Sequence, residues 1–162
     1  MIQTIRKIQP SDNIALKKVI RDVLLEHNVP KVGTAYADAS LDCMFETYTK
    51  KDCIYFVVEL NGKIIGGAGV APLEEESLDT CELQKMYFLS EARGLGIGAS
   101  VMEKCLQSAR NFGFKNCYLE TMTYMNDAQK LYKKYGFEYI DTRMGATGHS
   151  ACPVLMLKKL RL

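Results

Sequence analysis

The stretch between residues 82 and 100 constrains the fold of this chain most, because it joins a strand, a glycine-rich loop and a helix. The strand is Glu82-Leu-Gln-Lys-Met-Tyr-Phe88, and the loop is Arg93-Gly-Leu-Gly-Ile-Gly98. Alternate glycines let consecutive backbone N–H groups turn toward one point, where the helix N-terminus adds its positive dipole end. This pattern predicts an anion site, most often for phosphate, with Arg93 as a fixed positive charge. The alternative is a flexible connector whose glycines serve close packing.

Hydrophobic periodicity predicts the other elements. An Asn61-Gly62 dipeptide between two apolar runs predicts a tight hairpin. The helix after the glycine loop is expected to begin near residues 95–96, and Asn126 is expected to cap the next helix. Because the order combines a hairpin with strand–helix–strand crossovers, the sheet is mixed and the class is α/β or α+β. The expected strands cover residues 2–8, 53–60, 63–70, 81–88, 117–121, 137–142 and 154–160, and the expected helices follow apolar stripes at residues 16–24, 41–50, 101–109 and 128–135.

The composition is that of one ordinary globular domain over residues 1–162, with 48% hydrophobic and 25% charged residues. The net charge of +2 is too small to predict a nucleic-acid or membrane-surface partner. No apolar run approaches the ~18 residues of a membrane helix, and the first residues lack an apolar signal core, so we expect a cytoplasmic protein. Six cysteines without a C-x-x-C pair predict reduced thiols and no metal site.

The glycines of this loop match the patterns of two families of phosphate-binding loops. Gly94-x-Gly96-x-x-Ala99 fits the dinucleotide fingerprint, and Glu120 follows at a plausible distance. A dinucleotide-binding strand is usually buried on both faces and strongly apolar, whereas the strand at residues 82–88 contains three polar residues. The chain also runs through two expected helices and a hairpin before this strand. A nucleotide-binding oxidoreductase domain is therefore the weaker interpretation.

The second family fits three separate motifs. The loop from Arg93 to Gly98 matches the R/Q-x-x-G-x-G/A pyrophosphate loop of the GNAT superfamily of N-acetyltransferases, and the strand before it resembles that superfamily's fourth strand. Ala128-Gln-Lys-Leu-Tyr-Lys-Lys-Tyr-Gly-Phe137 resembles the A-x-x-L-Y-x-x-x-G-F segment, although the family's usual asparagine falls on Met125 and Asn126 comes one place late. The element order agrees too, so the resemblance covers nearly the whole chain. It implies the GNAT acyl-CoA N-acyltransferase fold, a mixed, mostly antiparallel sheet of about seven strands flanked by about four helices.

The resemblance implies acetyl-CoA as the co-substrate. In GNAT enzymes the fourth and fifth strands splay apart and the pantetheine arm fills the gap. The backbone of Met86 and Phe88 is therefore expected to bind the arm, with the Met86 N–H directed at the thioester oxygen. Asn126 is expected to touch the arm as well as to cap its helix. The pyrophosphate is expected to lie on the loop and the first helical turn, formed by Arg93, Gly94, Leu95, Gly96, Ile97, Gly98, Ala99 and Ser100.

The resemblance also implies catalytic groups. Tyr132 matches the family tyrosine that protonates the departing CoA thiolate, and a phenol with a pKa near about 10 can donate at neutral pH. A plain aromatic on a buried helix face is the other interpretation of Tyr132. Glu82 is the candidate base, because it stands four residues before Met86 and so on the same strand face. An exposed edge carboxylate is the competing interpretation of Glu82, while Glu120, His149 and water are alternative bases.

The implied function is transfer of an acetyl group from acetyl-CoA to a primary amine by direct attack. A non-catalytic acyl-CoA-binding or regulatory module with the GNAT fold is the alternative. The acceptor is a small-molecule or peptide amine that the sequence does not identify. Phe45 and Tyr48 stand on the helix that lines the acceptor pocket in GNAT proteins, and core packing explains them equally well. The loop at residues 145–152 carries no substrate assignment, and no motif specifies the homodimer that is common in this family.

Overall fold

The computed structural model describes residues 1–161, which form one seven-stranded sheet. The strand order is β1-β2-β3-β4-β5-β7-β6, and all neighbouring pairs are antiparallel except the parallel pair β4 and β5. The mixed, mostly antiparallel sheet is therefore confirmed. The strands are β1 (Gln3–Lys7), β2 (Ile54–Leu60), β3 (Lys63–Pro72), β4 (Thr80–Phe88), β5 (Asn116–Thr121), β6 (Glu138–Ile140) and β7 (Val154–Lys159).

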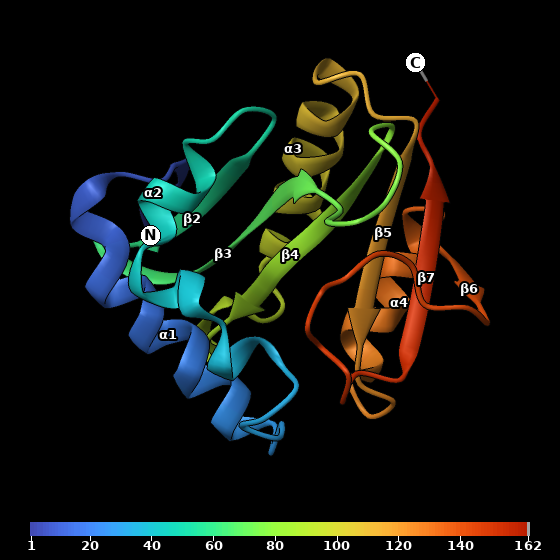
Figure 1. Cartoon of the computed structure of the whole chain (residues 1–162). Helices are drawn as coiled ribbons and strands as arrows, with labels where there is room; N and C mark the ends of the chain where they lie inside the picture. Colours follow the sequence, from blue (N-terminus) through green and yellow to red (C-terminus); the bar gives the residue numbers. More distant parts are fainter. Residues whose placement is uncertain (162) are drawn as a thin grey trace.

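Helices cover both faces of the sheet (Figure 1). One apolar cluster joins α1 and α2 to the first face, which we call the α1/α2 face, and a second cluster joins α3 and α4 to the opposite α3/α4 face. Among the described residues, no helix is long and apolar enough to cross a membrane. The α-helices are α1 (Asn13–Glu26), α2 (Met44–Tyr48), α3 (Ile97–Asn111) and α4 (Asn126–Lys134).

Local patterns predicted several details of this fold correctly. Asn61 and Gly62 join β2 to β3, and their φ angles of +51° and +79° are those that a tight hairpin turn requires. The apolar stripe predicted for α3 is buried along its whole length. The helix expected over residues 41–50 is shorter, because residues 39–42 form a 3-10 turn before α2 begins.

Strands β4 and β5 diverge along their length. They pair at only three positions, from Thr80 opposite Asn116 to Glu82 opposite Tyr118. Beyond these positions β4 continues to Phe88, and the two ribbons open into a wedge in Figure 1. The splay that the GNAT resemblance implies is therefore present, and it leaves one edge of β4 without a strand partner over its second half.

A β-bulge interrupts β4 at Lys85. Two residues of β4, Lys85 and Met86, lie opposite the single Ala68 of β3. Lys85 has a φ of +48°, which is rare for a residue other than glycine. The buried hydroxyl of Tyr55 on β2 donates to the Lys85 carbonyl oxygen at 2.7 Å. This hydrogen bond satisfies a carbonyl in a region where the bulge disrupts the regular ladder.

The bulge shifts the alternation of side chains along β4 by one position. Before it, Leu83 packs in the α3/α4 cluster, while Glu82 and Gln84 line a cavity on the α1/α2 face. After it, Met86 packs in the α3/α4 cluster. The expectation that Glu82 and Met86 share a face is therefore wrong, because the extra residue moves Met86 to the opposite side.

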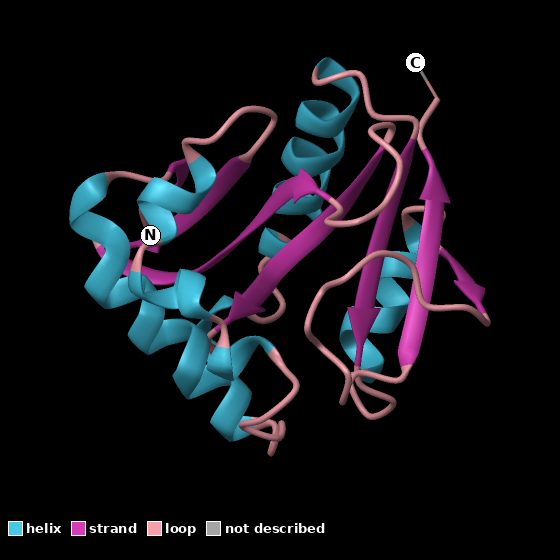
Figure 2. Cartoon of the chain, in the orientation of Figure 1, coloured by secondary structure: helices cyan, strands magenta, loops and turns pink. Residues whose placement is uncertain are grey.

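The connection between β6 and β7, residues 141–153, arches over the α1/α2 face beside the diverging strands (Figure 2). Within it, Arg143 donates to the carbonyl oxygens of His149 at 3.2 Å and Cys152 at 2.8 Å. The backbone N–H of Ala151 donates to the Gly33 carbonyl at 3.0 Å. The loop after α1 and the loop before β7 are thus tied together over the divergence of β4 and β5.

Candidate active site

The glycine loop has the geometry of an anion cradle. Gly94 and Gly96 have φ angles of +74° and +71°, a conformation that other residues rarely adopt. Gly96 directly precedes α3, whose first N–H groups have no acceptor within the helix and point outward with its positive dipole end. Gly98 lies in the first turn of α3, where an added Cβ would come within 3.1 Å of Leu131 on α4. The loop therefore combines free donors with close packing of α3 against α4.

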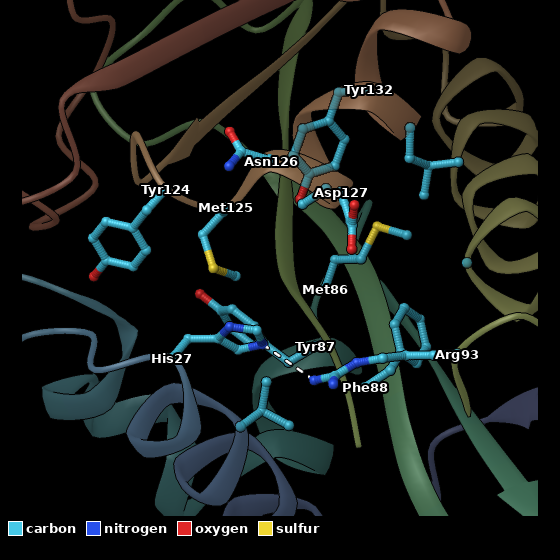
Figure 3. Close-up of a pocket in the computed structure, with 14 residues that line it drawn as sticks. His27, Met86, Tyr87, Phe88, Arg93, Tyr124, Met125, Asn126, Asp127 and Tyr132 are labelled. Atoms are coloured by element: carbon cyan, nitrogen blue, oxygen red, sulfur yellow. Dashed lines mark hydrogen bonds between the residues drawn. The ribbon is translucent and has the colours of Figure 1, made fainter. Parts of the chain in front are cut away.

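A cavity of about 400 Å³, which we call the glycine-loop cavity, opens beside this loop (Figure 3). Its walls come from the second half of β4, the start of α4 and the C-terminal end of α1, and are mostly apolar, as in ligand pockets generally. Five of the predicted cofactor residues line it, namely Met86, Phe88, Arg93, Gly98 and Asn126. The others, Gly94, Leu95, Gly96, Ile97, Ala99 and Ser100, belong to the adjacent loop and helix start rather than to the lining.

Arg93 stands at this cavity with its guanidinium already engaged. It donates to Glu26 Oε1 at 2.7 Å, and the same nitrogen lies 3.4 Å from His27 Nε2 (Figure 3). The Arg93 and Glu26 side chains are 51% and 42% exposed. Exposed pairs of this kind contribute at most about 1 kcal/mol. An anion at the loop would therefore displace Glu26 from Arg93 at small cost.

Tyr132 on α4 directs its hydroxyl into the same cavity (Figure 3). The residue is 7% exposed, and its ring packs edge-on against Phe137 with the centroids 6.0 Å apart. Burial raises the pKa of Tyr132 above the usual value of a phenol. The hydroxyl therefore stays protonated at neutral pH and is able to donate. The Tyr132 ring therefore packs in the core while its hydroxyl remains available as a hydrogen-bond donor in the cavity.

The start of α4 differs from the prediction. Met125 is the N-cap, and Asn126 is already the first helical residue, so the capping role predicted for Asn126 is wrong. A cap residue needs a non-helical backbone, which Met125 supplies. The side-chain amide of Gln129 instead donates to the carbonyls of Met122 at 2.9 Å and Thr123 at 3.2 Å, which holds the loop before the helix. Asn126 and Met125 both line the glycine-loop cavity.

Glu82 lies in a second cavity of about 580 Å³ on the α1/α2 face, which we call the Glu82 cavity. The residue is 6% exposed, so it is not an edge carboxylate in solvent. Gln84 donates to its carboxylate at 2.6 Å, and the Tyr48 hydroxyl donates to Gln84 at 2.7 Å. Burial raises the pKa of Glu82, and the Gln84 hydrogen bond and the charges of His149 and Lys85 offset only part of that shift. A carboxylate with a raised pKa is a stronger base than a surface glutamate.

The other two candidate bases are held by charged partners. The side chain of Glu120 is buried and forms an ion pair with Arg143. His149 Nε2 lies 3.0 Å from both carboxylate oxygens of Asp38. The ion pair engages the Glu120 carboxylate, whereas Asp38 engages only the Nε2 of His149 and leaves its Nδ1 without a partner among residues 1–161. Glu82 differs from both in having no charged partner at hydrogen-bond distance within the described residues.

A smaller pocket of about 40 Å³ between the diverging strands, which we call the central passage, shares lining residues with both cavities. Tyr87 lines both cavities and the passage. Tyr132 lines the passage from the glycine-loop side, and Lys85 and Glu120 line it from the Glu82 side. Both cavities therefore border one shared space between β4 and β5.

Sequence reasoning missed three charged or titratable residues of this site. Lys85 and Asp38 lie in the Glu82 cavity and pair at 3.1 Å, and His27 lies beside Arg93. A signal for Lys85 was present, because the adjacent polar residues Gln84 and Lys85 break the alternation of the strand as a bulge does. Asp38 and His27 stand in a loop and at a helix end, where no periodicity relates them to their partners Lys85 and Arg93, which are 47 and 66 positions away.

The remaining candidates have packing roles. Tyr48 is buried and its ring lies 5.0 Å from that of Tyr55, centroid to centroid, while Phe45 packs partly buried against the same cluster. Neither lines the Glu82 cavity. The six cysteines are free thiols. Among residues 1–161, no group of three or more His, Cys, Asp or Glu side chains is placed to hold a metal ion.

Comparison with known proteins identifies the family. The profile described as "Acetyltransferase (GNAT) family" matches residues 20–137. The chain is 42% identical over 156 residues to "Uncharacterized N-acetyltransferase YjgM" of Escherichia coli (strain K12), which covers 96% of this chain and 93% of that protein.

Solved structures share the fold over the whole chain. An acetyltransferase of the GNAT family from Staphylococcus aureus Mu50 superposes with a TM-score of 0.87 at 19% identity, covering 99% of this chain and 100% of the other. The PaiA N-acetyltransferase of Thermoplasma acidophilum, determined in complex with coenzyme A, superposes with a TM-score of 0.75 at 18% identity, covering 98% and 99%. With its glycine loop and diverging strands, the chain belongs to the GNAT family and is an N-acetyltransferase.

Proposed function

We propose that the protein transfers the acetyl group of acetyl-CoA to a primary amine by direct attack within a ternary complex. The observation that carries this proposal is the central passage, which lies between the diverging strands and shares lining residues with both the glycine-loop cavity and the Glu82 cavity. A donor in the first cavity and an amine in the second would meet without a covalent enzyme intermediate. Membership of the GNAT family and the coenzyme A bound to the related PaiA enzyme support acetyl-CoA as the donor.

The free edge of β4 fits the pantetheine arm. The N–H of Leu89 donates to the Ile65 carbonyl of β3 at 2.8 Å. Since alternate residues of a strand direct their backbone groups to opposite edges, those of Phe88 and Met86 face the divergence from β5. Their side chains also give the cavity apolar walls. The backbone of these two residues would therefore bind the arm where a neighbouring strand would otherwise pair.

The glycine loop fits the pyrophosphate. The first N–H groups of α3, which precede the Ser100 N–H that donates to the Gly96 carbonyl, have no acceptor within the helix, and Arg93 adds a guanidinium at the cavity. Bound acetyl-CoA supplies a thioester carbonyl that is activated toward an amine. The Met86 N–H would stabilise the negative charge that develops on the thioester oxygen, and one such donor contributes roughly 3 kcal/mol in the transition state.

Two side chains would move the protons. Glu82 accepts a proton from the amine, directly or through water, because burial raises its pKa toward the range of a useful base. Tyr132 donates a proton to the departing thiolate, because burial raises the pKa of its phenol and keeps it protonated. Tyr132 lines the glycine-loop cavity and the central passage, and Glu82 lines the Glu82 cavity, so the proposed acid and base belong to different cavities.

Gly96→Leu tests the assignment of the loop, and Gly113→Leu is the matched control. Both glycines have positive φ, +71° and +89°, and both leave open space for an added Cβ, so the backbone strain should be similar. Gly96 precedes the N-terminus of α3, whereas Gly113 follows its C-terminus. Acetyl-CoA at about 100 times its Kd should raise the unfolding free energy of the wild type and of Gly113→Leu by roughly 2.7 kcal/mol. It should fail to stabilise Gly96→Leu, and equal stabilisation of both variants would overturn the loop assignment.

Release of CoA thiol separates catalysis from binding. We expect acetyl-CoA and CoA to stabilise the protein and an amine panel to release thiol in an amine-dependent way. Stabilisation without thiol release from any amine would favour the acyl-CoA-binding module. Stabilisation by NAD(H) alone would favour a nucleotide-binding domain and overturn the proposal.

A further inference from the structure

Lys85 places an ammonium group inside the Glu82 cavity. Its side chain is 6% exposed, and the residue lines both this cavity and the central passage. Lysine is almost never buried to this extent without a partner, because removing the charge from water is costly. The partner is Asp38, whose Oδ2 lies 3.1 Å from the Lys85 Nζ.

Asp38 does not use all the hydrogen-bonding capacity of this ammonium. Lysine has three N–H donors, and within the described part of the chain Asp38 is the one acid paired with Lys85. Asp38 is also shared, since both its oxygens lie 3.0 Å from His149 Nε2. Burial raises the pKa of Asp38, but the His149 hydrogen bond and the Lys85 charge outweigh burial, so this carboxylate stays ionised. Donors of Lys85 that point away from Asp38 are therefore available to a ligand.

The backbone is strained at the residue that carries this group. Lys85 has a φ of +48°, and the hydroxyl of Tyr55 holds its carbonyl at 2.7 Å. In a regular strand, position 85 would follow Leu83 into the α3/α4 core. The bulge instead turns the ammonium toward the cavity. Strained residues of this kind are concentrated where function requires a side chain at a particular place.

We propose that Lys85 binds a carboxylate group of the acceptor, and that the acceptor is an amino acid or a related amine that carries a carboxylate. This specificity rests on the proposed acetyl transfer. Glu82 stands three residues earlier on β4 and lines the same cavity, where it takes the amine end of the acceptor. At a rise of about 3.3 Å per residue the two backbone positions are about 10 Å apart. With both side chains turned inward, the cavity offers opposite charges to the two ends of a compact zwitterion.

The cavity is lined by acids as well as by lysines. Asp38 and Glu120 are already in ion pairs, whereas Glu74 and Glu82 form no ion pair within residues 1–161. Lys50 and Lys51 are exposed, so water screens their charges. The choice of an amino acid over a polyamine or a lysine-rich peptide therefore rests on the buried ammonium of Lys85, and the acceptor panel tests it.

Matched acceptors test the proposal in the wild type. Each set contains an L-amino acid, its carboxamide and the amine formed by its decarboxylation, with CoA thiol release as the readout. Acetyl-CoA binding is measured in parallel by thermal unfolding. The wild-type KM for the amino acid should be at least about tenfold below that for the carboxamide or the decarboxylated amine, because a hydrogen bond between charged groups is lost in both.

Lys85→Met removes the ammonium and keeps an apolar side chain of similar length. It should raise the KM for the amino acid by about 10- to 100-fold and abolish the preference over the carboxamide, with the KM for acetyl-CoA unchanged. Lys130→Met, at an exposed lysine that lines neither cavity nor the central passage, is the matched control and should leave both KM values unchanged.

Four results would overturn the assignment of Lys85 as the carboxylate-binding residue. Equal KM values for amino acids and carboxamides in the wild type would overturn the proposal even if Lys85→Met fails to fold. An unchanged preference in a folded Lys85→Met would overturn it too. Acetylation of polyamines or lysine peptides without activity on amino acids would also overturn it, while the proposed acetyl transfer would stand. Absence of both acetyl-CoA stabilisation and amine-dependent thiol release would overturn both proposals.

Discussion

Replacing Tyr55 with phenylalanine isolates the hydroxyl that holds the bulge of β4. The Tyr55 side chain is fully buried, and its hydroxyl donates to the Lys85 carbonyl at 2.7 Å. Phenylalanine keeps the ring, which packs against Tyr48 with the centroids 5.0 Å apart, so the substitution opens no large cavity. The change removes one hydrogen bond and leaves a carbonyl in the interior without its donor.

An unsatisfied buried group of this kind costs about 1–3 kcal/mol of folding free energy. For a domain of this size, each kcal/mol lowers Tm by about 2–4 °C. The Tm of Tyr55→Phe, measured by calorimetry or circular dichroism, should therefore fall by about 2–12 °C. Because the released carbonyl belongs to Lys85, the variant should also raise the KM for the acceptor more than the KM for acetyl-CoA.

Tyr139→Phe is the matched control for this experiment. The Tyr139 hydroxyl also makes a 2.7 Å hydrogen bond, to Gln129 Oε1, but the residue is 50% exposed. Water replaces this partner, so Tm should change by no more than about 2 °C. Equal losses of Tm in the two variants would show that the buried hydroxyl of Tyr55 contributes no more to stability than an exposed hydroxyl does. The assignment of Tyr55 as the anchor of the bulge would then be refuted.

Two further substitutions test the proton transfers. Tyr132→Phe should lower kcat by about 10²- to 10⁴-fold with acetyl-CoA binding unchanged, and an unchanged kcat would exclude Tyr132 as the acid. Glu82→Gln should abolish the rise of kcat/KM with pH that deprotonation of Glu82 produces, and a profile parallel to that of the wild type would assign the base elsewhere. Because burial raises the folded-state pKa of Glu82, the wild type loses stability as pH rises from the unfolded-state pKa to the folded-state pKa. Denaturant unfolding at about pH 4 and about pH 8 should therefore show Glu82→Gln gaining stability relative to the wild type at the higher pH, and a constant difference would contradict the raised pKa.

The element order and sheet could be predicted because they depend on local chemistry. Asn61-Gly62 specifies a tight turn wherever it stands between apolar runs. The alternate glycines at residues 94–98 tolerate the positive φ angles that the structure shows at Gly94 and Gly96. The apolar stripe of α3 has the period of a helix with one buried face. Each of these signals lies within about 15 residues, so no knowledge of distant contacts is needed.

The arrangement of the site could not be predicted in the same way, because it depends on contacts between distant segments. The wrong assignment of Glu82 and Met86 to one face came from counting by two along β4 without the bulge at Lys85. That bulge is held by Tyr55, 30 residues earlier in the sequence. The ion pair between Lys85 and Asp38 joins a strand to an irregular loop, in which no periodicity marks one residue as special.

The bulge divides β4 into two halves. Before position 85 the even-numbered residues face the α1/α2 side of the sheet, and after it they face the α3/α4 side. Glu82 and Gln84, before the bulge, thus line the Glu82 cavity, whereas Met86 and Phe88, after it, line the glycine-loop cavity, and Tyr87 lines both. Deletion of a single residue at this point would move Met86, Tyr87 and Phe88 to the opposite faces together. Diversification of the acceptor in such a chain is accordingly easier by point substitution than by insertion or deletion in this strand.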